Sequence, residues 1–312
     1  MLRCYLQTVI VYCLLQIKGE RSIYSIFHII NGKKSSQSIQ DAHLFQIAPF
    51  FQSYHFVNRE VFDQNITQLL TNKWIRKTKE HHYLVTEIGK VTLEMQIIEK
   101  PFPVYLNGLT YQSMTETFWA RLSLLVQVSS NLVHKQSQYI PIQRKDEIQL
   151  WLKNALLDLP TSRNELARQL FSELTTLFDQ DHSLDPSPVI MRLTGYNHIG
   201  LTPQQAALSL GQEYTLYHLR FLNVIHFMIR IIEQDSKQYP ILFSVIKDLQ
   251  HPFYFTSSTM KTYELLRSGL TLNQIAQIRK LKQSTIEDHV VEITFNDKRF
   301  MIDPLLLLRS KL

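Results

Sequence analysis

With 312 residues, 45% of them hydrophobic and 19% charged, the chain can bury the cores of two or three domains and is not a disordered protein. Eight glycines are too few for glycine-rich phosphate loops or a sheet-dominated fold, and the apolar residues recur mostly at helical spacing, so we expect a mostly α-helical protein. A formal net charge of +6 suits a polyanion partner, although ordinary solubility explains a charge of this size equally well.

The chain opens on an apolar run, Leu2 to Ile17, that superficially resembles a signal peptide. Arg3 is the only charge ahead of the apolar stretch, two glutamines interrupt it, and it lacks a small-residue cleavage site. The run is also too short to span a bilayer, so we expect a core helix and no membrane partner. Cys4 and Cys13 both fall in this helix. Two thiols in one short helix cannot form a disulfide framework, and they are typical of a protein in a reducing compartment. The expected location is the cytoplasm, with association with the nucleoid left open.

Residues 1–100 are expected to form a winged-helix domain. The apolar helix is followed by the runs ERSIYSIFHIINGKK and SSQSIQDAHLFQIAPFF and by a helix at 61–71. Two short β-prone runs, 74–78 and 83–86, then flank a polar tip, which is typical of a hairpin wing. An irregular surface hairpin without a ligand is the alternative.

Residues 101–250 are expected to form a helical middle domain. Pro101 and Pro103 predict an extended linker at its start. Thr202 and Pro203 begin a further helix, and the long apolar helix after it completes either a helical hairpin, which we favour, or another helix-turn-helix. The other amphipathic helices expected here cover residues 111–133, 146–157 and 162–178, and a loop is expected at 178–188.

Residues 251–312 carry the clearest pattern, three short amphipathic helices spaced as a helix-turn-helix. Thr271 with Gln274, and Ser284 with Glu287, have the capping-box spacing that begins a helix. The residues expected to pack the second and third helices together, with Leu281 in the turn between them, are Leu272, Ile275, Ala276, Ile278, Ile286, Val290 and Ile293.

Nucleotide, metal and catalytic motifs all lack their required spacing. Gly32-Lys33-Lys34-Ser35 lacks the earlier glycine of a phosphate loop, which would fall at Phe27, and Leu201 stands where a lysine would follow Gly200. The sequence has neither a Gly-x-Ser-x-Gly elbow nor the ligand spacing of a zinc or calcium site. We therefore expect no catalytic residue, cofactor, metal or small-molecule substrate, and no enzyme activity in this chain.

The excess positive charge lies at the two ends of the chain. Lys and Arg outnumber Asp and Glu by 12 to 8 in residues 1–100 and by 9 to 6 in 251–312, against 12 to 13 in 101–250. Counterion release favours phosphate binding by such ends. The candidate DNA-contact residues are, in the C-terminal turn and third helix, Arg279, Lys280, Lys282, Gln283, Ser284, Thr285 and His289, and, in the first domain, Lys33, Lys34, Ser36, Gln37, Arg76, Lys77 and Lys79.

Acidic residues in the third C-terminal helix limit what DNA recognition can involve. Glu287 and Asp288 suit the start of a helix but repel phosphate, so backbone- or structure-directed binding is favoured over base recognition. A protein partner on this face is the rival hypothesis. Ser38-Ile39-Gln40-Asp41 also parallels Thr285-Ile286-Glu287-Asp288, each after a lysine-bearing turn, as a weak internal repeat.

Two stretches of the chain resemble known families. LTLNQIAQIRKLKQSTIEDHVVEI resembles the helicase helix-turn-helix domain at the C-terminus of some RecQ-type helicases, and GERSIYSIFHIINGKKSSQSIQDAHLFQI looks like the N-terminus of the YpbB family of Firmicute bacteria. The resemblance implies a non-catalytic, DNA-binding accessory factor in DNA repair or recombination, with a RecQ-like helicase as the partner that supplies the motor. The chain departs from the helix-turn-helix family at one point. The module usually continues further than it does here, where the sequence finishes with RFMIDPLLLLRSKL.

Two other functions are compatible with the same residues. A protein-interaction adaptor would bind the helicase through its helix-turn-helix units without touching DNA. A transcription regulator would instead prefer particular sites, which it would bind roughly a thousandfold or more above background.

Overall fold

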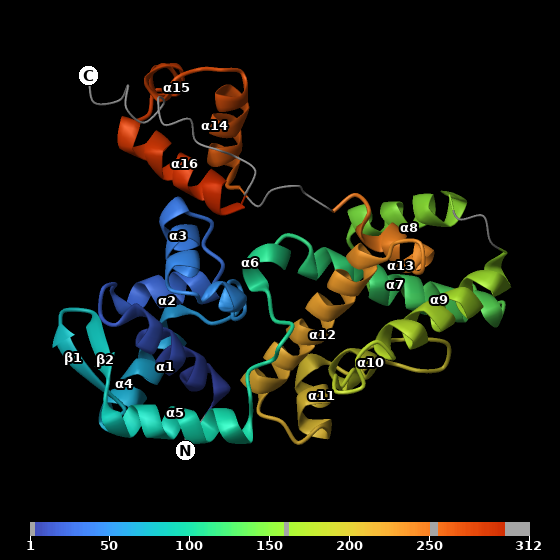
Figure 1. Ribbon diagram of the computed structural model, residues 1–312. Helices are drawn as coiled ribbons and strands as arrows, with labels where there is room; N and C mark the ends of the chain where they lie inside the picture. Colours follow the sequence, from blue (N-terminus) through green and yellow to red (C-terminus); the bar gives the residue numbers. More distant parts are fainter. Residues whose placement is uncertain (1–3, 159–161, 250–254, 297–312) are drawn as a thin grey trace. The chain divides into compact units, whose positions relative to one another are not determined.

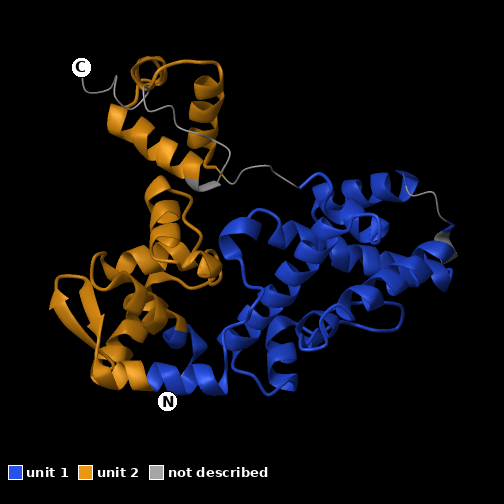
Figure 2. Cartoon of the chain, viewed as in Figure 1, with its two compact units in different colours: residues 1–8, 92–250 blue, residues 9–91, 251–312 orange. Residues whose placement is uncertain are grey.

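The computed structural model describes residues 4–158, 162–249 and 255–296. Apart from one β-hairpin, the regular elements of these residues are helices, as the sequence predicts (Figure 1). The chain forms two compact units, unit 1 from residues 1–8 and 92–250 and unit 2 from residues 9–91 and 251–312 (Figure 2). Segments from both ends thus belong to unit 2, and the division into three domains at 100 and 250 stays a prediction.

The N-terminal part of the chain is a winged-helix arrangement. Helix α1 (Tyr5–Ile17) is buried along most of its length, because most of its side chains are apolar, and Val9, Ile10 and Cys13 are each 0% exposed. The predicted core helix is therefore confirmed, although Cys4 lies just ahead of α1 instead of within it. The elements in order are α1 (Tyr5–Ile17), α2 (Ile23–Ile30), α3 (Ser36–Leu44), the 3-10 helix η1 (Ala48–Phe50), α4 (Arg59–Thr71), β1 (Ile75–Lys79), β2 (His82–Val85) and α5 (Glu87–Glu99).

The predicted wing is the antiparallel pair β1 and β2. Ile75 pairs with Val85 at the open end, and His81 at the tip takes a left-handed backbone with φ of 56°. Trp74 and Ile75 are buried and anchor the hairpin on unit 2. Gly89 packs against this anchor so closely that a Cβ would lie 2.0 Å from the carbonyl oxygen of Trp74, so only glycine fits there.

Unit 1 is a helical assembly around α12 (Tyr214–Gln234), which packs against α7 (Thr115–Val133), α10 (Ser187–Ile190), α11 (Pro203–Ser209) and α13 (Pro240–Ile246). Tyr217, Phe221, Val224 and Phe227 on α12 are at most 5% exposed, as predicted, and Thr202 caps α11 in a capping box. None of the helices formed by the described residues combines the length and apolar character that a bilayer crossing needs. The elements are α6 (Gly108–Tyr111), α7 (Thr115–Val133), α8 (Asp146–Asp158), α9 (Arg163–Phe178), α10 (Ser187–Ile190), α11 (Pro203–Ser209), α12 (Tyr214–Gln234) and α13 (Pro240–Ile246).

Three helices near the C-terminus, α14 (Ser257–Arg267), α15 (Leu272–Arg279) and α16 (Gln283–Asn296), form the predicted helix-turn-helix. Thr271 and Gln274 make the predicted capping box. Helix α16 begins at Gln283, so the prediction that Ser284 caps it is wrong, and Ser284 lies inside the first turn. The reason is local: Lys280 takes a left-handed backbone, with φ of 53°, and ends α15 so abruptly that the chain turns early.

Apolar side chains hold α15 and α16 together. Leu272, Ile275, Ile286 and Val290 form a buried cluster, Ala276 and Leu281 pack against it, and Ile293 is also buried. The prediction for Ile278 is wrong, since its side chain is 58% exposed. It lies six residues beyond Leu272, which is about 240° around the helix and outside the stripe that faces α16.

His226 is buried in unit 1 between two fixed groups. Its Nδ1 accepts a hydrogen bond from the backbone N of Asn107 at 3.0 Å, and its Nε2 lies 3.1 Å from Thr115 Oγ1. The Thr115 hydroxyl already donates to the carbonyl of Tyr111, so His226 carries its proton on Nε2 and is neutral. Burial lowers the pKa of His226 to about 3.

Acidification is therefore expected to destabilise unit 1 through His226. The unfolded chain takes up a proton near pH 6.5 and the folded chain does not, so the unfolding free energy falls by about 1.4 kcal/mol per pH unit below that point. Urea unfolding of the whole chain between pH 7 and 5 measures the slope. The control is the variant His226→Gln, whose side chain does not titrate. Its unfolding free energy should fall less steeply with decreasing pH, by about the 1.4 kcal/mol per pH unit that one proton contributes. Equal slopes would contradict the assignment.

Candidate nucleic-acid interface

The turn between α15 and α16 presents two cations to solvent. Leu281 packs into the cluster between the helices, and its backbone N donates to the carbonyl of Ala276 at 3.0 Å. Because Leu281 points inward, its neighbours Lys280 and Lys282 point outward, and both are exposed. The two lysines therefore stand at the entrance to α16, where phosphate contacts position a helix-turn-helix on DNA.

Arg279 turns into the three-helix module, unlike its neighbours. Its Nη1 donates to the carbonyl of Ser258 at 2.7 Å and to Thr262 Oγ1, and its Nη2 donates to Ser258 Oγ at 2.9 Å. These bonds join the end of α15 to α14. The contact of Arg279 with DNA stays a prediction, and in this structure the guanidinium is hydrogen-bonded to Ser258 and Thr262 of α14.

His289 belongs to the same polar cluster and is only 3% exposed. Its Nδ1 lies 2.8 Å from Thr262 Oγ1, which donates to it because the hydroxyl oxygen accepts from Arg279. Burial and, next, the charge of Arg279 lower the pKa of His289, so the imidazole is neutral. Contact of His289 with a base stays a prediction, but its side chain is now inside the module.

The first turns of α16 are polar and partly acidic. Gln283 is half-buried and its Nε2 donates to Glu287 Oε1 at 3.1 Å, Ser284 is exposed, and Thr285 is half-buried. Glu287 and Asp288 are both exposed. Carboxylates on this face repel phosphate, as the sequence indicates, so the cations of the preceding turn have to supply the attraction.

The predicted N-terminal residues lie on the turn before α3. Lys33 and Lys34 are exposed in this turn, and Ser35 caps α3 by accepting from the backbone N of Ser38. Gln37 is exposed, and its Nε2 donates to Asp41 Oδ1 at 2.8 Å. Ser36 instead faces α16, where its Oγ donates to Glu292 Oε2 at 2.9 Å. The structure thus brings α3 and α16, the two repeated elements of the sequence, into contact.

The wing adds a third group of cations. Arg76, Lys77 and Lys79 are all exposed on β1, which the buried Ile75 anchors at its start. Lys73 is also exposed, just ahead of the hairpin, and is absent from the predicted set. Its position next to a β-prone run rich in lysine and arginine is the signal that could have identified it.

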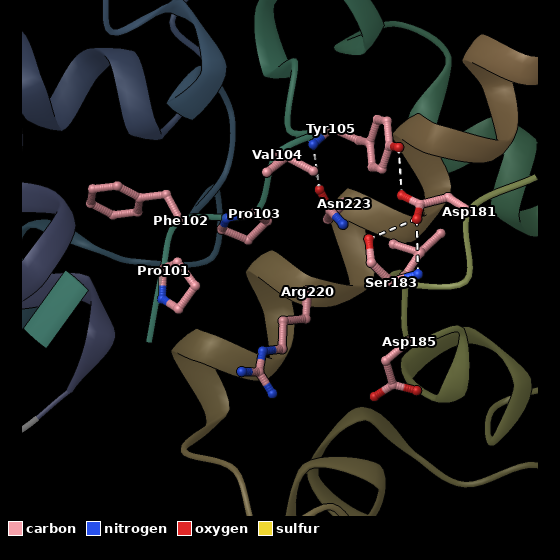
Figure 3. A pocket seen from close by; sticks show the side chains of 11 residues that line it. Pro101, Phe102, Pro103, Val104, Tyr105, Asp181, Ser183, Asp185, Arg220 and Asn223 are labelled. Atoms are coloured by element: carbon pink, nitrogen blue, oxygen red, sulfur yellow. Dashed lines mark hydrogen bonds between the residues drawn. The ribbon is translucent and has the colours of Figure 1, made fainter. Parts of the chain in front are cut away.

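A separate pocket lies in unit 1, with a volume of about 310 Å³ (Figure 3). Tyr105 Oη donates to Asp181 Oδ2 at 2.6 Å, and the backbone N and Oγ of Ser183 both donate to Asp181 Oδ1. Hydrogen bonds from Ser183 and then Tyr105 hold the pKa of Asp181 below its usual range. Arg220 and Asp185 lie at other sides of the pocket.

In the part of the chain that the structure describes, no three His, Cys, Asp or Glu side chains come together as a metal site. Residues 258–311 match the model of a helix-turn-helix domain family. Protein YpbB of Bacillus subtilis (strain 168) is 33% identical to this chain over 300 residues, which cover 96% of this chain and 84% of that protein. Comparison with solved structures gives no significant match.

Arg279 and Lys280 are adjacent cations with different predicted effects on stability. Arg279→Ala removes three hydrogen bonds to α14 and leaves partly buried acceptors, so the unfolding free energy should fall by about 1–3 kcal/mol. Lys280→Ala removes the same charge from an exposed side chain and should cost less than about 0.5 kcal/mol. Urea unfolding of the two variants measures both values. Equal losses would show that Arg279 is not a structural residue.

Proposed function

This chain belongs to the YpbB family, and we propose that it is a non-catalytic DNA-binding accessory factor that works with a RecQ-like helicase in DNA repair or recombination. The observation that carries DNA binding is the helix-turn-helix domain, matched over residues 258–311, with exposed lysines at the entrance to its third helix. Family and domain both favour a binding protein over an enzyme.

The proposed contact surface consists of cations held by buried anchors. Leu281 fixes the turn that presents Lys280 and Lys282, and Ile75 fixes the strand of the wing. Cations placed on such rigid supports lose little conformational entropy when they meet a phosphate. The contact residues that we propose are Lys280, Lys282, Gln283, Ser284 and Thr285 near α16, Lys33, Lys34 and Gln37 near α3, and Arg76, Lys77 and Lys79 on the wing.

Binding should be directed by the DNA backbone or by DNA structure more than by sequence. The exposed side chains of the first turns of α16 include Glu287 and Asp288, which cannot approach phosphates favourably. Ser284 and half-buried Gln283 and Thr285 are the polar side chains left there for base edges. A transcription regulator, which needs base recognition, is therefore disfavoured.

The helicase partnership rests on resemblance. The segment that runs through α15 and α16 resembles the helix-turn-helix of RecQ-type helicases, which supports a similar mode of DNA contact in both proteins. A helicase partner would also supply the motor that this chain's sequence lacks. We propose a cytoplasmic or nucleoid-associated protein, without a membrane partner, small-molecule substrate, cofactor or metal.

An adaptor without DNA contact is the second candidate. The acidic exposed face of α16, with Glu287 and Asp288, suits a basic protein surface better than a phosphate backbone. Such an adaptor would bind the helicase and show no salt-dependent affinity for DNA.

The double variant Lys280→Ala/Lys282→Ala is expected to weaken duplex binding and its salt dependence. Each lysine that neutralises a phosphate contributes about 0.9 to the slope of log K against log salt, so the slope should fall by up to about 1.8. Fluorescence anisotropy at several salt concentrations measures this slope.

The matched control is Lys145→Ala/Lys153→Ala, which removes the same charge from two exposed lysines in unit 1. It should leave the slope within about 0.3 of the original. A turn variant that keeps the full slope would show that DNA is held elsewhere. Absence of DNA binding by the original protein would favour the adaptor.

A further inference from the structure

Helix α3 packs directly on α16, the third helix of the helix-turn-helix. Ser36 Oγ donates to Glu292 Oε2 at 2.9 Å, and Gln40 Nε2 donates to the backbone carbonyl of Asp288 at 3.1 Å. Both helices belong to unit 2. The two bonds lie one turn apart on each helix, so α3 runs along α16 instead of touching it at a point.

The acceptor of the first bond is fixed in the interior of the module. Glu292 is 0% exposed; its Oε1 accepts from the backbone N of Thr256 at 2.6 Å, and its Oε2 accepts from Thr259 Oγ1 at 2.6 Å. The carboxylate therefore sits at the N-terminus of α14, where backbone N–H groups favour a negative charge. Ser36 binds to this fixed carboxylate, so α3 has a defined docking position on the module.

Helix α16 cannot lie along a groove of duplex DNA while α3 is packed beside Asp288 and Glu292, although Ser284 in its first turn stays exposed. The major groove is about 12 Å wide and admits one helix, whose diameter with side chains is about 10–12 Å. Two packed helices have axes about 8–10 Å apart and together are about 20 Å wide. Helices α14 and α15 already cover Ile286 and Val290 on the inner side of α16, and α3 lies beside Asp288 and Glu292.

We propose that α3 is an autoinhibitory element that keeps the helix-turn-helix out of the groove of duplex DNA until α3 separates from α16. This inference rests on the proposed DNA-binding function. In the closed form, with α3 packed on α16, Lys280, Lys282 and the wing cations remain exposed and permit weak binding to the DNA backbone. In the open form, α16 is free to enter the groove, and the apparent affinity is reduced by the fraction of molecules that are open.

Two side-chain hydrogen bonds, from Ser36 and Gln40, link α3 to α16, and contacts of α16 with DNA would compete with them. The bond from Ser36 is the stronger one, because its acceptor is a carboxylate, and the bond from Gln40 has a backbone carbonyl as its acceptor. Interactions of the open form with the groove would then replace the hydrogen bonds of the closed form. A ligand that binds only one of two states shifts their populations by that difference in affinity.

A disulfide between the two helices tests the closed form. The pair Gln40→Cys/Asp288→Cys is placed in a Cys4→Ala background, in which Cys13 stays fully buried. Oxidation is expected to lock α3 on α16 and weaken binding to a duplex oligonucleotide at least about tenfold, and reduction of the same sample should restore it. The single variant Gln40→Cys, treated identically, controls for the oxidant and should not change on oxidation.

A release variant tests the same contact in the opposite direction. Gln40→Ala removes one bond of the closed form, and Gln40 is not among the proposed DNA-contact residues. The loss of one such bond corresponds to a change in the opening equilibrium on the order of two- to tenfold, so duplex binding should tighten by that factor.

Three outcomes overturn the inference. The cysteine pair fails to cross-link, or the cross-linked protein binds duplex as tightly as the reduced protein, or Gln40→Ala binds no more tightly than the original. Absence of duplex binding by every sample, oxidised or reduced, ends the proposed DNA-binding function and this inference with it. Cross-linking without an effect on affinity, in a protein that does bind duplex, ends the inference alone.

Discussion

The buried carboxylate of Glu292 is the interaction on which unit 2 depends. It accepts from Thr256, Thr259 and Ser36, and the last of these bonds joins residues 256 positions apart in the chain. A carboxylate removed from water is costly unless donors surround it, so the helices that supply them are held around one charge. Through this group the start of α14, the interior of α16 and the start of α3 share one anchor.

Packing around that anchor decides which cations are available to a ligand. The buried cluster draws Leu281 inward and leaves Lys280 and Lys282 outside, whereas Arg279 and His289 are both hydrogen-bonded to Thr262 inside the module. Positive charge therefore reaches the surface at a few supported points and not along α16 itself. A protein built in this way attracts phosphates beside the helix-turn-helix, and its acidic third helix keeps base recognition secondary.

Local patterns in the sequence predicted the elements that local forces build. The hairpin, the capping box of Thr271 and the stripe of Ile286, Val290 and Ile293 follow from alternation, cap chemistry and helical spacing, and the structure confirms them. The orientation of Arg279 and the pairing of α3 with α16 depend on residues far along the chain, which no local pattern contains. The parallel between Ser38–Asp41 and Thr285–Asp288 marked the two helices as alike, but it gave no sign that they touch.

Amide hydrogen exchange of the full chain, with and without duplex DNA, tests most directly whether both ends of the chain form one DNA-binding surface. We predict that DNA slows exchange together in the turn before α3, in β1 of the wing and in the turn from Lys280 to Lys282, with unit 1 unchanged. Protection confined to unit 1, or to one of these three segments alone, would contradict a shared surface.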